Sequence, residues 1–192
     1  MVKRAASNEV RSAQFEVRSG VETDPSSLRT SHWPLRTVSS TIVVFSSDLD
    51  RALAAFIIAN GAATMGQEVT LFFTFWGLNV LRKDRPVKVR KTFIERMFGR
   101  MMPRGARRLA LSKMHMAGVG KRMIEGIMRR KGVASLPDLI ASAQRAGVKL
   151  VACQMSMDLM GIKAEELIDG VSLGGVATYL DRASAGRVNL FI

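Results

Sequence analysis

The only cysteine of the chain, Cys153, stands where an apolar run meets a short helical pattern, within the stretch VKLVACQMSMD. A side chain at a strand-to-helix junction lies beside free backbone N–H groups and the positive end of a helix dipole, and both favour a thiolate. Cys153 could therefore be a nucleophile that carries sulfur. It could equally be a small buried side chain, because unpaired cysteine is among the most buried residue types.

Other groups that favour an anion are expected close to this thiol. Gly174 and Gly175 open a later helix, and Ser47 follows the first apolar run of the chain. Backbone N–H groups at the helix starts near Gln154 and Gly174 would stabilise a thiolate or a persulfide. Tight packing of a helix against a strand is the alternative explanation for the glycine pair.

The residue types argue against several common sites. With one cysteine and two histidines, the chain lacks the ligands of a structural zinc site, so no metal is expected. A GxGxxG motif is absent, which disfavours a dinucleotide fold, and no cofactor is expected. The Gly118–Lys121 stretch departs from a phosphate-binding loop, because His115 and Arg122 replace residues that this motif requires.

The elements that position Cys153 alternate between strand and helix patterns. The predicted strands are 41–45, 68–74, 148–152, 169–173 and 187–192, and the predicted helices between them are 49–65, 137–146, 156–160 and 174–185. This order predicts a three-layer α/β/α, flavodoxin-like fold with a mostly parallel sheet of about five strands. Because the carboxyl ends of parallel strands share one edge, Ser47, Cys153 and Gly174 should gather there.

Positive charge is concentrated in one insert between the second and third strands, residues 82–131. It holds 17 of the 29 Lys and Arg residues and three acids, a net charge of +14, whereas the rest of the chain carries −1. The insert could dock an acidic protein, lie on an anionic membrane or bind nucleic acid, or its cations could simply be solvated while its methionines pack in the core or at a subunit contact. The composition disfavours nucleic acid, because Phe93 and Phe98 are the only aromatic residues of the insert. The docking candidates are Arg82, Lys83, Lys88, Arg90, Arg107 and Arg108.

Length and composition set the remaining expectations. A chain of 192 residues with 47% apolar side chains can form one sizeable domain, predicted at 39–192. The polar residues 1–38 are predicted to be a mobile extension without a signal peptide. A single cysteine and the lack of a long apolar segment favour a cytoplasmic protein, with peripheral contact to a membrane as a further possibility.

Two stretches resemble a known family. One is TIVVFSSDLDRALAAFIIAN followed by MGQEVTLFFTFWGLNVLRK, and the other is ACQMSMDLMGI followed by GVSLGGVATY. Together they cover most of residues 41–192 and are similar to the DsrE/DsrF/DsrH-like family, in its DsrE2-type branch. The label "peroxiredoxin family" that accompanies this branch is not supported, because the chain lacks a peroxidatic cysteine motif with a nearby Thr and Arg.

The resemblance implies a sulfur-relay protein. Cys153 matches the cysteine on which relatives carry sulfane sulfur, which they exchange with rhodanese-like and TusA-like proteins. A second cysteine that some relatives use is missing here, so a two-cysteine relay within one subunit is not expected. The resemblance also implies a homo-oligomer, a trimer, tetramer or hexamer.

Two functions follow from these observations. The first is a sulfur carrier or sulfurtransferase, which requires that the Cys153 thiol can be reached from outside. The second is a non-catalytic module that binds a protein or a membrane, with a buried cysteine and a basic docking insert.

Overall fold

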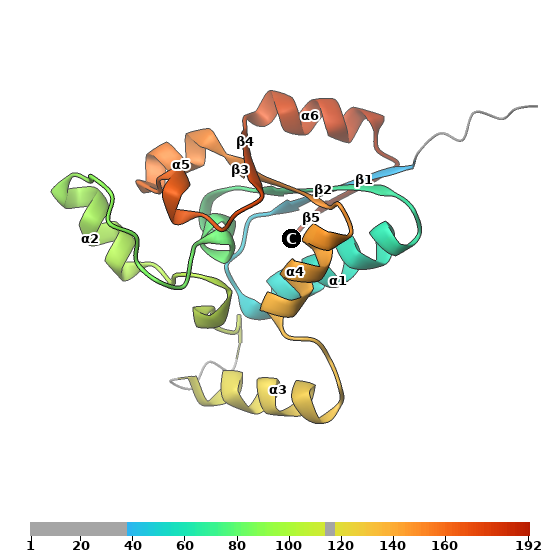
Figure 1. Cartoon of the computed structure of the whole chain (residues 1–192), viewed down its shortest axis with the longest axis horizontal. Helices are drawn as coiled ribbons and strands as arrows, with labels where there is room; N and C mark the ends of the chain where they lie inside the picture. The colour runs from blue at the N-terminus through green and yellow to red at the C-terminus, as the bar shows by residue number, and fades with distance from the viewer. Residues whose placement is uncertain (1–37, 114–117) are drawn as a thin grey trace, which may run out of the picture. The chain divides into compact units, whose positions relative to one another are not determined.

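Five parallel strands form a single sheet with the order β4-β3-β2-β1-β5 (Figure 1). The computed structural model describes residues 38–113 and 118–192, so nearly all of the expected extension at 1–38 lies outside the described residues. The strands are β1 (Ser39–Val44), β2 (Glu68–Phe73), β3 (Lys149–Cys153), β4 (Val171–Gly174) and β5 (Val188–Phe191). The predicted flavodoxin-like α/β fold is confirmed.

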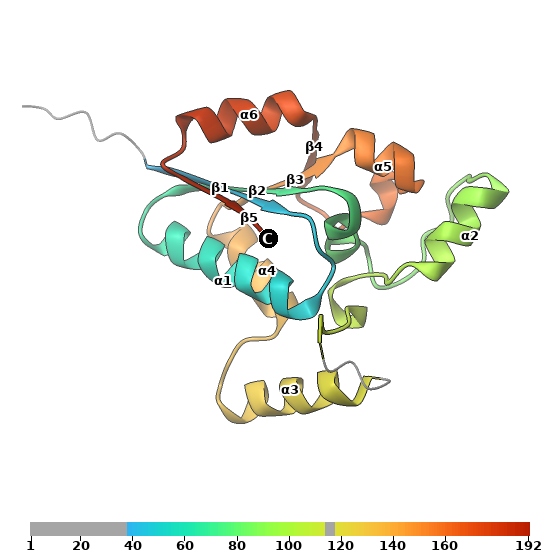
Figure 2. The ribbon, with the colours of Figure 1, turned by 180° about the vertical axis from the view of Figure 1, so that it is seen from behind.

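Helices cover both faces of this sheet. Helices α1 (Leu49–Thr64) and α4 (Leu136–Arg145) lie on one face, and α6 (Val176–Ala185) lies on the other (Figures 1 and 2). The chain builds the sheet outward from β1 to β4 and then returns to place β5 on the free side of β1. Because crossovers between parallel strands are right-handed, this reversal sends α6 to the opposite face from α1.

The main core lies between the sheet and α1 with α4. It holds alternate strand residues such as Leu71 and Phe73, because successive side chains of a strand point to opposite faces. Helix α1 contributes Leu49, Leu53 and Phe56 to this core. The apolar pattern of 49–65 also predicts Ile57 in this buried stripe, but Ile57 is 52% exposed. It lies one position past Phe56, and a step of about 100° along the helix turns it away from the sheet.

The other face of the sheet is covered much more thinly. Its cluster consists of Phe72, Val151 and Cys153, with Tyr179 of α6 packed against them. Helix α6 has no buried residue, and its Val176 and Leu180 are more than half exposed. The period of two along β3 therefore places Cys153 on the side of the sheet with the lighter cover.

The insert is more ordered than the sequence predicts. The insert contains α2 (Phe93–Met101), η3 (Ala106–Arg108) and α3 (Val119–Arg130), and η2 (Phe75–Leu81) comes just before it. The apolar residues at 93–94 and 97–98 predict one or two amphipathic turns, but α2 is nine residues long, because Thr92 and Glu95 make reciprocal hydrogen bonds at its start.

Many apolar side chains of the insert are exposed. The apolar pattern predicts a helix over 119–130 with Met123 and Ile127 on its apolar side; α3 has these bounds, but the two side chains are 48% and 39% exposed. Met97 and Met101 of α2 are also exposed, while Met102 is buried. The insert therefore presents cations and methionine side chains together on its surface. Within 38–113 and 118–192, no helix is both long and apolar enough to cross a membrane.

Candidate functional site

The sole thiol lies at the carboxyl edge of the sheet, as the sequence predicts. Cys153 is the last residue of β3 and the N-cap of α5 (Gln154–Met160), which begins at the next residue. On the neighbouring strand, Gly174 is its direct partner in the parallel register. The end of β3 and the start of α6 are thus brought together by strand pairing, although some twenty residues of chain separate them.

The thiol is enclosed in the isolated subunit. Cys153 is 1% exposed and packs with Phe72, Val151 and Tyr179, which form an apolar surrounding. The rings of Phe72 and Tyr179 lie 5.3 Å apart, centroid to centroid, and tilt against each other by 37°. The expectation of a thiol that is open to solvent is therefore wrong for this conformation, because α6 brings Tyr179 onto the cluster that holds Cys153.

The two glycines beside the thiol have different reasons to be there. A Cβ atom on Gly174 would come within 2.8 Å of Val151 Cγ1 and 3.4 Å of Thr178, so tight packing alone demands glycine. Gly175 is the N-cap of α6 and has open space where a Cβ would stand. The free N–H groups of the first turn of α6 follow directly after it.

Other polar groups lie along the same edge without a hydrogen bond to the thiol among the described residues. Thr74 follows β2, and its hydroxyl is 2.8 Å from that of Ser156 in α5. Ser47 is half-buried after β1, where it is Ser46, not Ser47, that hydrogen-bonds to Asp48 at the start of α1. Gln154 is exposed. These groups share the edge, as expected, but they form no joint anion cradle around the sulfur in this conformation.

Strain and close approach mark the segment between β2 and the insert at this edge. Phe75 has a φ of 46°, a left-handed conformation that is unusual for an aromatic residue. Two residues later, Gly77 N–H donates to Phe45 O at 2.7 Å, and a Cβ on Gly77 would stand 2.0 Å from Val44 O. The sharp turn of η2 across the end of β1 therefore requires this glycine.

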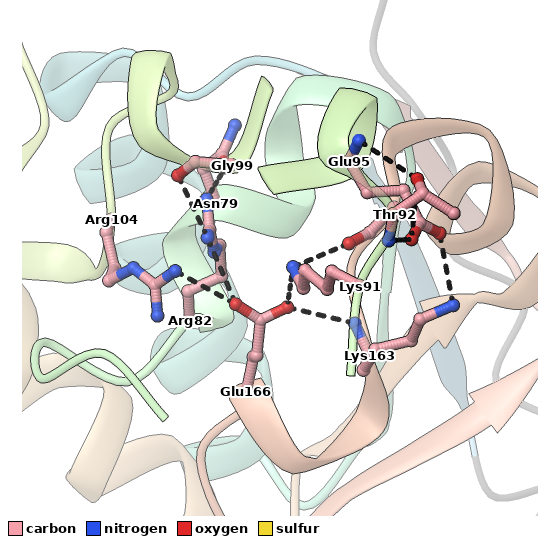
Figure 3. A network of polar contacts seen from close by, with 10 residues as sticks. Asn79, Arg82, Lys91, Thr92, Glu95, Gly99, Arg104, Lys163 and Glu166 are labelled. Carbon is pink, nitrogen blue, oxygen red and sulfur yellow. Dashed lines mark hydrogen bonds and ion pairs between the residues drawn. The ribbon is translucent and has the colours of Figure 1, made fainter. Parts of the chain in front are cut away.

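A buried ionic cluster joins the insert to the loop between β3 and β4 (Figure 3). Glu166, at the end of η5 (Ala164–Glu166), accepts from Arg82 at 3.3 Å and from Arg104 at 2.9 Å, and it also pairs with Lys91. Arg82 was expected on the docking surface, and this is a correction, because its side chain is fully buried. The Arg82 guanidinium points into the interior of the subunit, where it pairs with the Glu166 carboxylate.

The surroundings of Glu166 keep it charged. Burial raises the pKa of Glu166, but hydrogen bonds from Lys91 and from the Lys163 N–H, with the charges of Lys91 and Arg82, bring the pKa below its usual value. Burial lowers the pKa of Arg82, and the nearby charge of Arg104 adds to this, whereas Glu166 opposes both. One carboxylate thus faces three cations in a space with little water.

The remaining docking candidates are accessible. Lys83 is 39% exposed beside Asp169, and Arg107 is 75% exposed beside Asp84. Lys88, Arg90 and Arg108 are exposed as well. Five of the six candidate cations therefore stand on the surface of the insert, whereas Arg82 does not.

The buried cluster was missed at the level of sequence. The sequence predicts only a turn over 163–167, which includes Glu166, and it places Lys91 and Arg104 among the cations of the insert. One signal could have found it: an insert with so large an excess of positive charge needs a carboxylate from elsewhere, and Glu166 lies next to the apolar Leu167 and Ile168. A Glu in a buried stretch usually has a cationic partner.

The fold and the site together describe an α/β protein with a single thiol at the end of an inner strand. A buried carboxylate holds a basic insert to the same domain. The chain belongs to the DsrE/DsrF/DrsH-like family, whose model matches residues 37–191. The resemblance of the sequence to this family is confirmed.

Two relatives extend this assignment. The chain is 55% identical over 157 residues to the uncharacterized protein YrkE of Bacillus subtilis. This match covers 82% of this chain and 98% of YrkE. The chain is also 37% identical over 155 residues to the sulfur carrier protein DsrE2 of Allochromatium vinosum. This match covers 79% of this chain and 96% of DsrE2.

Solved structures with a similar backbone are more distant in sequence. The YchN protein of E. coli is 12% identical with a TM-score of 0.46, and the match covers 81% of this chain and all of that one. The protein of unknown function MTH1491 of Methanobacterium thermoautotrophicum is 13% identical with a TM-score of 0.49, with 81% and 99% coverage.

Proposed function

We propose that the protein is a sulfur carrier that holds sulfane sulfur on Cys153 as a persulfide and passes it to another protein. The observation that carries the proposal is the place of the only cysteine, at the end of β3 and in register with Gly174. Membership of the DsrE-like family and the relationship to a protein named as a sulfur carrier support it.

The chemistry needs one thiolate and no cofactor. The Cys153 thiolate attacks the outer sulfur of a donor persulfide, so that a new S–S bond forms at Cys153 and the donor leaves as a thiolate. A thiolate of the acceptor then attacks the outer sulfur, and Cys153 leaves in its turn. Each step breaks one sulfur–sulfur bond and forms another, so no net oxidant or reductant is consumed.

Transfer requires that the cover of Cys153 opens. The thiol packs under Tyr179 of α6, and this helix buries none of its residues, so moving it exposes little additional core. Local opening of weakly packed elements takes much less free energy than global unfolding. We therefore propose that α6 moves when a donor or an acceptor docks.

The partners we propose are rhodanese-like and TusA-like sulfur-transfer proteins. Exposed cations of the insert, Lys83, Lys88, Arg90, Arg107 and Arg108, would attract an acidic surface on such a partner. Donor binding should then weaken steeply as salt is added, because exposed charges are screened.

Mass spectrometry of the intact protein tests the proposal. Incubation with a persulfide donor should add about 32 Da, the mass of one sulfur atom, to the wild-type chain and nothing to Cys153→Ser. A thiol-containing acceptor should then remove the added mass. Absence of the adduct, while the thiol also resists alkylation until the protein is denatured, would rule out a carrier that works through Cys153.

The burial of Cys153 favours a second function, a non-catalytic module that binds a protein or membrane through the insert. Under this alternative the thiol is a packing residue and α3 supplies the contact, since Met123 and Ile127 are exposed among its cations. Cys153→Ser then keeps partner or vesicle binding, and the wild type gains no sulfur.

A further inference from the structure

A large hollow lies between the insert and the loop that carries Glu166. It has a volume of about 920 Å³ and is lined by Glu166 and by residues from three parts of the insert: 86–89 with Lys91, one side of α2, and 101–104 with Arg108 and Ala110. This volume lies within the range of about 300–1,000 Å³ that is typical of small-molecule sites. The cavity is distinct from the Cys153 cluster, since none of its lining residues belongs to that cluster.

The lining has a strong excess of positive charge. Among its residues only Glu95 and Glu166 are acids, whereas six are cations: Lys88, Lys91, Arg96, Arg100, Arg104 and Arg108. Glu95 is already paired with Lys163 at 3.3 Å, and Glu166 is shared by three cations. Four of the six lining cations, Lys88, Arg96, Arg100 and Arg108, make no ion pair with any residue that the structure describes.

Arg104 adds an unmet hydrogen-bond donor to this lining. Its Nη2 donates to Glu166 Oε1 at 2.9 Å, while its Nη1 is buried and has no partner among the described residues. The side chain is 15% exposed and lines the cavity. A buried donor without an acceptor is costly, and a guanidinium with one edge already held is well placed to bind an oxyanion.

Part of the lining is also held in place by the fold. Lys91 donates to Gly161 O at 2.6 Å, and Glu95 packs against Gly161, where a Cβ would stand 2.6 Å from Glu95 Cγ. These contacts tie the start of α2 to the end of α5. The positive lining is therefore built on anchored backbone, which focuses its field into one hollow.

We propose that this cavity binds a compact soluble anion with two or more negative charges, of the diphosphate class, through Arg104 and the unpaired cations Lys88 and Arg100. Two separate phosphate-like groups match a lining that offers several cations, and the donor of Arg104 gains an acceptor. The site is independent of sulfur transfer at Cys153.

Calorimetric titration with inorganic pyrophosphate tests the site at a constant ionic strength of about 0.15 M. The double variant Lys88→Gln/Arg100→Gln removes two exposed cations of the cavity and leaves the Glu166 cluster intact. The matched control Arg122→Gln/Arg130→Gln removes two exposed cations of α3, which do not line the cavity. We expect the cavity variant to bind pyrophosphate about tenfold or more weakly, and the control to bind within about twofold of the wild type.

Several results would overturn the proposal. One is that the wild type binds no pyrophosphate; another is that both double variants lose affinity equally, which would indicate only net charge. A third is that vesicles of phosphatidylglycerol bind through Lys88 and Arg100 while pyrophosphate does not compete. Cys153→Ser should bind pyrophosphate as the wild type does, so a failure of the sulfur-carrier proposal leaves this test unaffected.

Discussion

Glu166 is the residue on which the attachment of the insert depends. Its carboxylate is shared by Arg82, Lys91 and Arg104, and each of these cations is largely or wholly buried. A buried ion pair adds little stability compared with a well-packed apolar pair, but loss of one partner leaves the others uncompensated. With three cations around one anion, the loss of the anion is the most damaging change.

We expect Glu166→Gln to destabilise the protein by about 3–5 kcal/mol, the usual effect of breaking a buried ion pair. The control is Glu165→Gln at the neighbouring exposed position, which should change the free energy of unfolding by less than about 0.5 kcal/mol. Urea denaturation of both variants measures the difference. Equal stabilities would show that the cluster contributes nothing to the fold.

The same residue predicts a dependence of stability on pH. The folded-state pKa of Glu166 is lowered, so the unfolded chain binds the proton more readily than the folded chain does. Its contribution is thus complete above the unfolded-state pKa of about 4.3 and is lost as the pH falls below it and through the folded-state value. Melting temperatures between about pH 3 and 6 should fall less steeply for Glu166→Gln than for the wild type.

Substitution of Tyr179 should make the Cys153 thiol accessible to reagents. The Tyr179 ring packs against Phe72 in the cluster that holds Cys153. We expect Tyr179→Ala to speed alkylation of Cys153 in the folded protein about tenfold or more, because a loss of about 1.4 kcal/mol of packing is enough for a tenfold change. Asp181→Ala, an exposed change on the same helix, is the control. An unchanged rate in Tyr179→Ala would mean that Cys153 opens by another route.

Among the elements, η2 imposes the strictest local demand on sequence. It turns across the end of β1 so closely that a Cβ on Gly77 would overlap Val44 O at 2.0 Å. Since the neighbour is backbone in a central strand, it cannot move aside easily. With any side chain at position 77, η2 would have to shift and would lose the hydrogen bond from the N–H of this residue to Phe45 O.

We expect Gly77→Ala to destabilise the protein by about 3 kcal/mol or more, as backbone overlap in a core does. Gly61→Ala in α1 is the matched control, because a Cβ there meets nothing within 4 Å. That change should stabilise the helix by about 0.5–1 kcal/mol, since alanine loses less backbone freedom than glycine. Thermal melts of the two variants should therefore move in opposite directions.

The elements of the sheet could be predicted because their signals are local. Strand β2 is a continuous apolar run, and α3 begins and ends at the predicted residues. The exposure of Ile57 and Met123 could not be predicted, since it depends on which surfaces other elements cover. The same applies to the site: the position of Cys153 follows from its own strand and helix, whereas its cover by Tyr179 and the pairing of Arg82 with Glu166 join residues far apart in the chain.

At the scale of the whole molecule, apolar side chains stay exposed on α6 and on the edge strand β5. Val176 is 52% exposed, Leu180 56% and Phe191 71%. Exposed apolar side chains that gather into a patch are typical of contacts between proteins. This exposure agrees with the expected homo-oligomer, which stays a prediction.

We expect Leu180→Glu to lower the molar mass in solution, measured by light scattering, because a charge would be buried in the subunit contact. Ile57→Glu introduces the same charge on α1, which lies on the opposite face of the sheet (Figure 2). That control should keep the mass of the wild type. Equal masses for all three proteins would place any subunit contact elsewhere.

The pairing of β1 with β5 has a consequence for biosynthesis. Ser40 pairs with Val188, so β1 leaves the ribosome roughly 150 residues before its second neighbour, a delay of about 7–30 s at about 5–20 residues per second. During that interval one edge of β1 stays open to pairing with another nascent chain. Chaperones that hold unfolded chains should therefore matter more for the yield of this protein than for a fold whose neighbouring strands are adjacent in sequence.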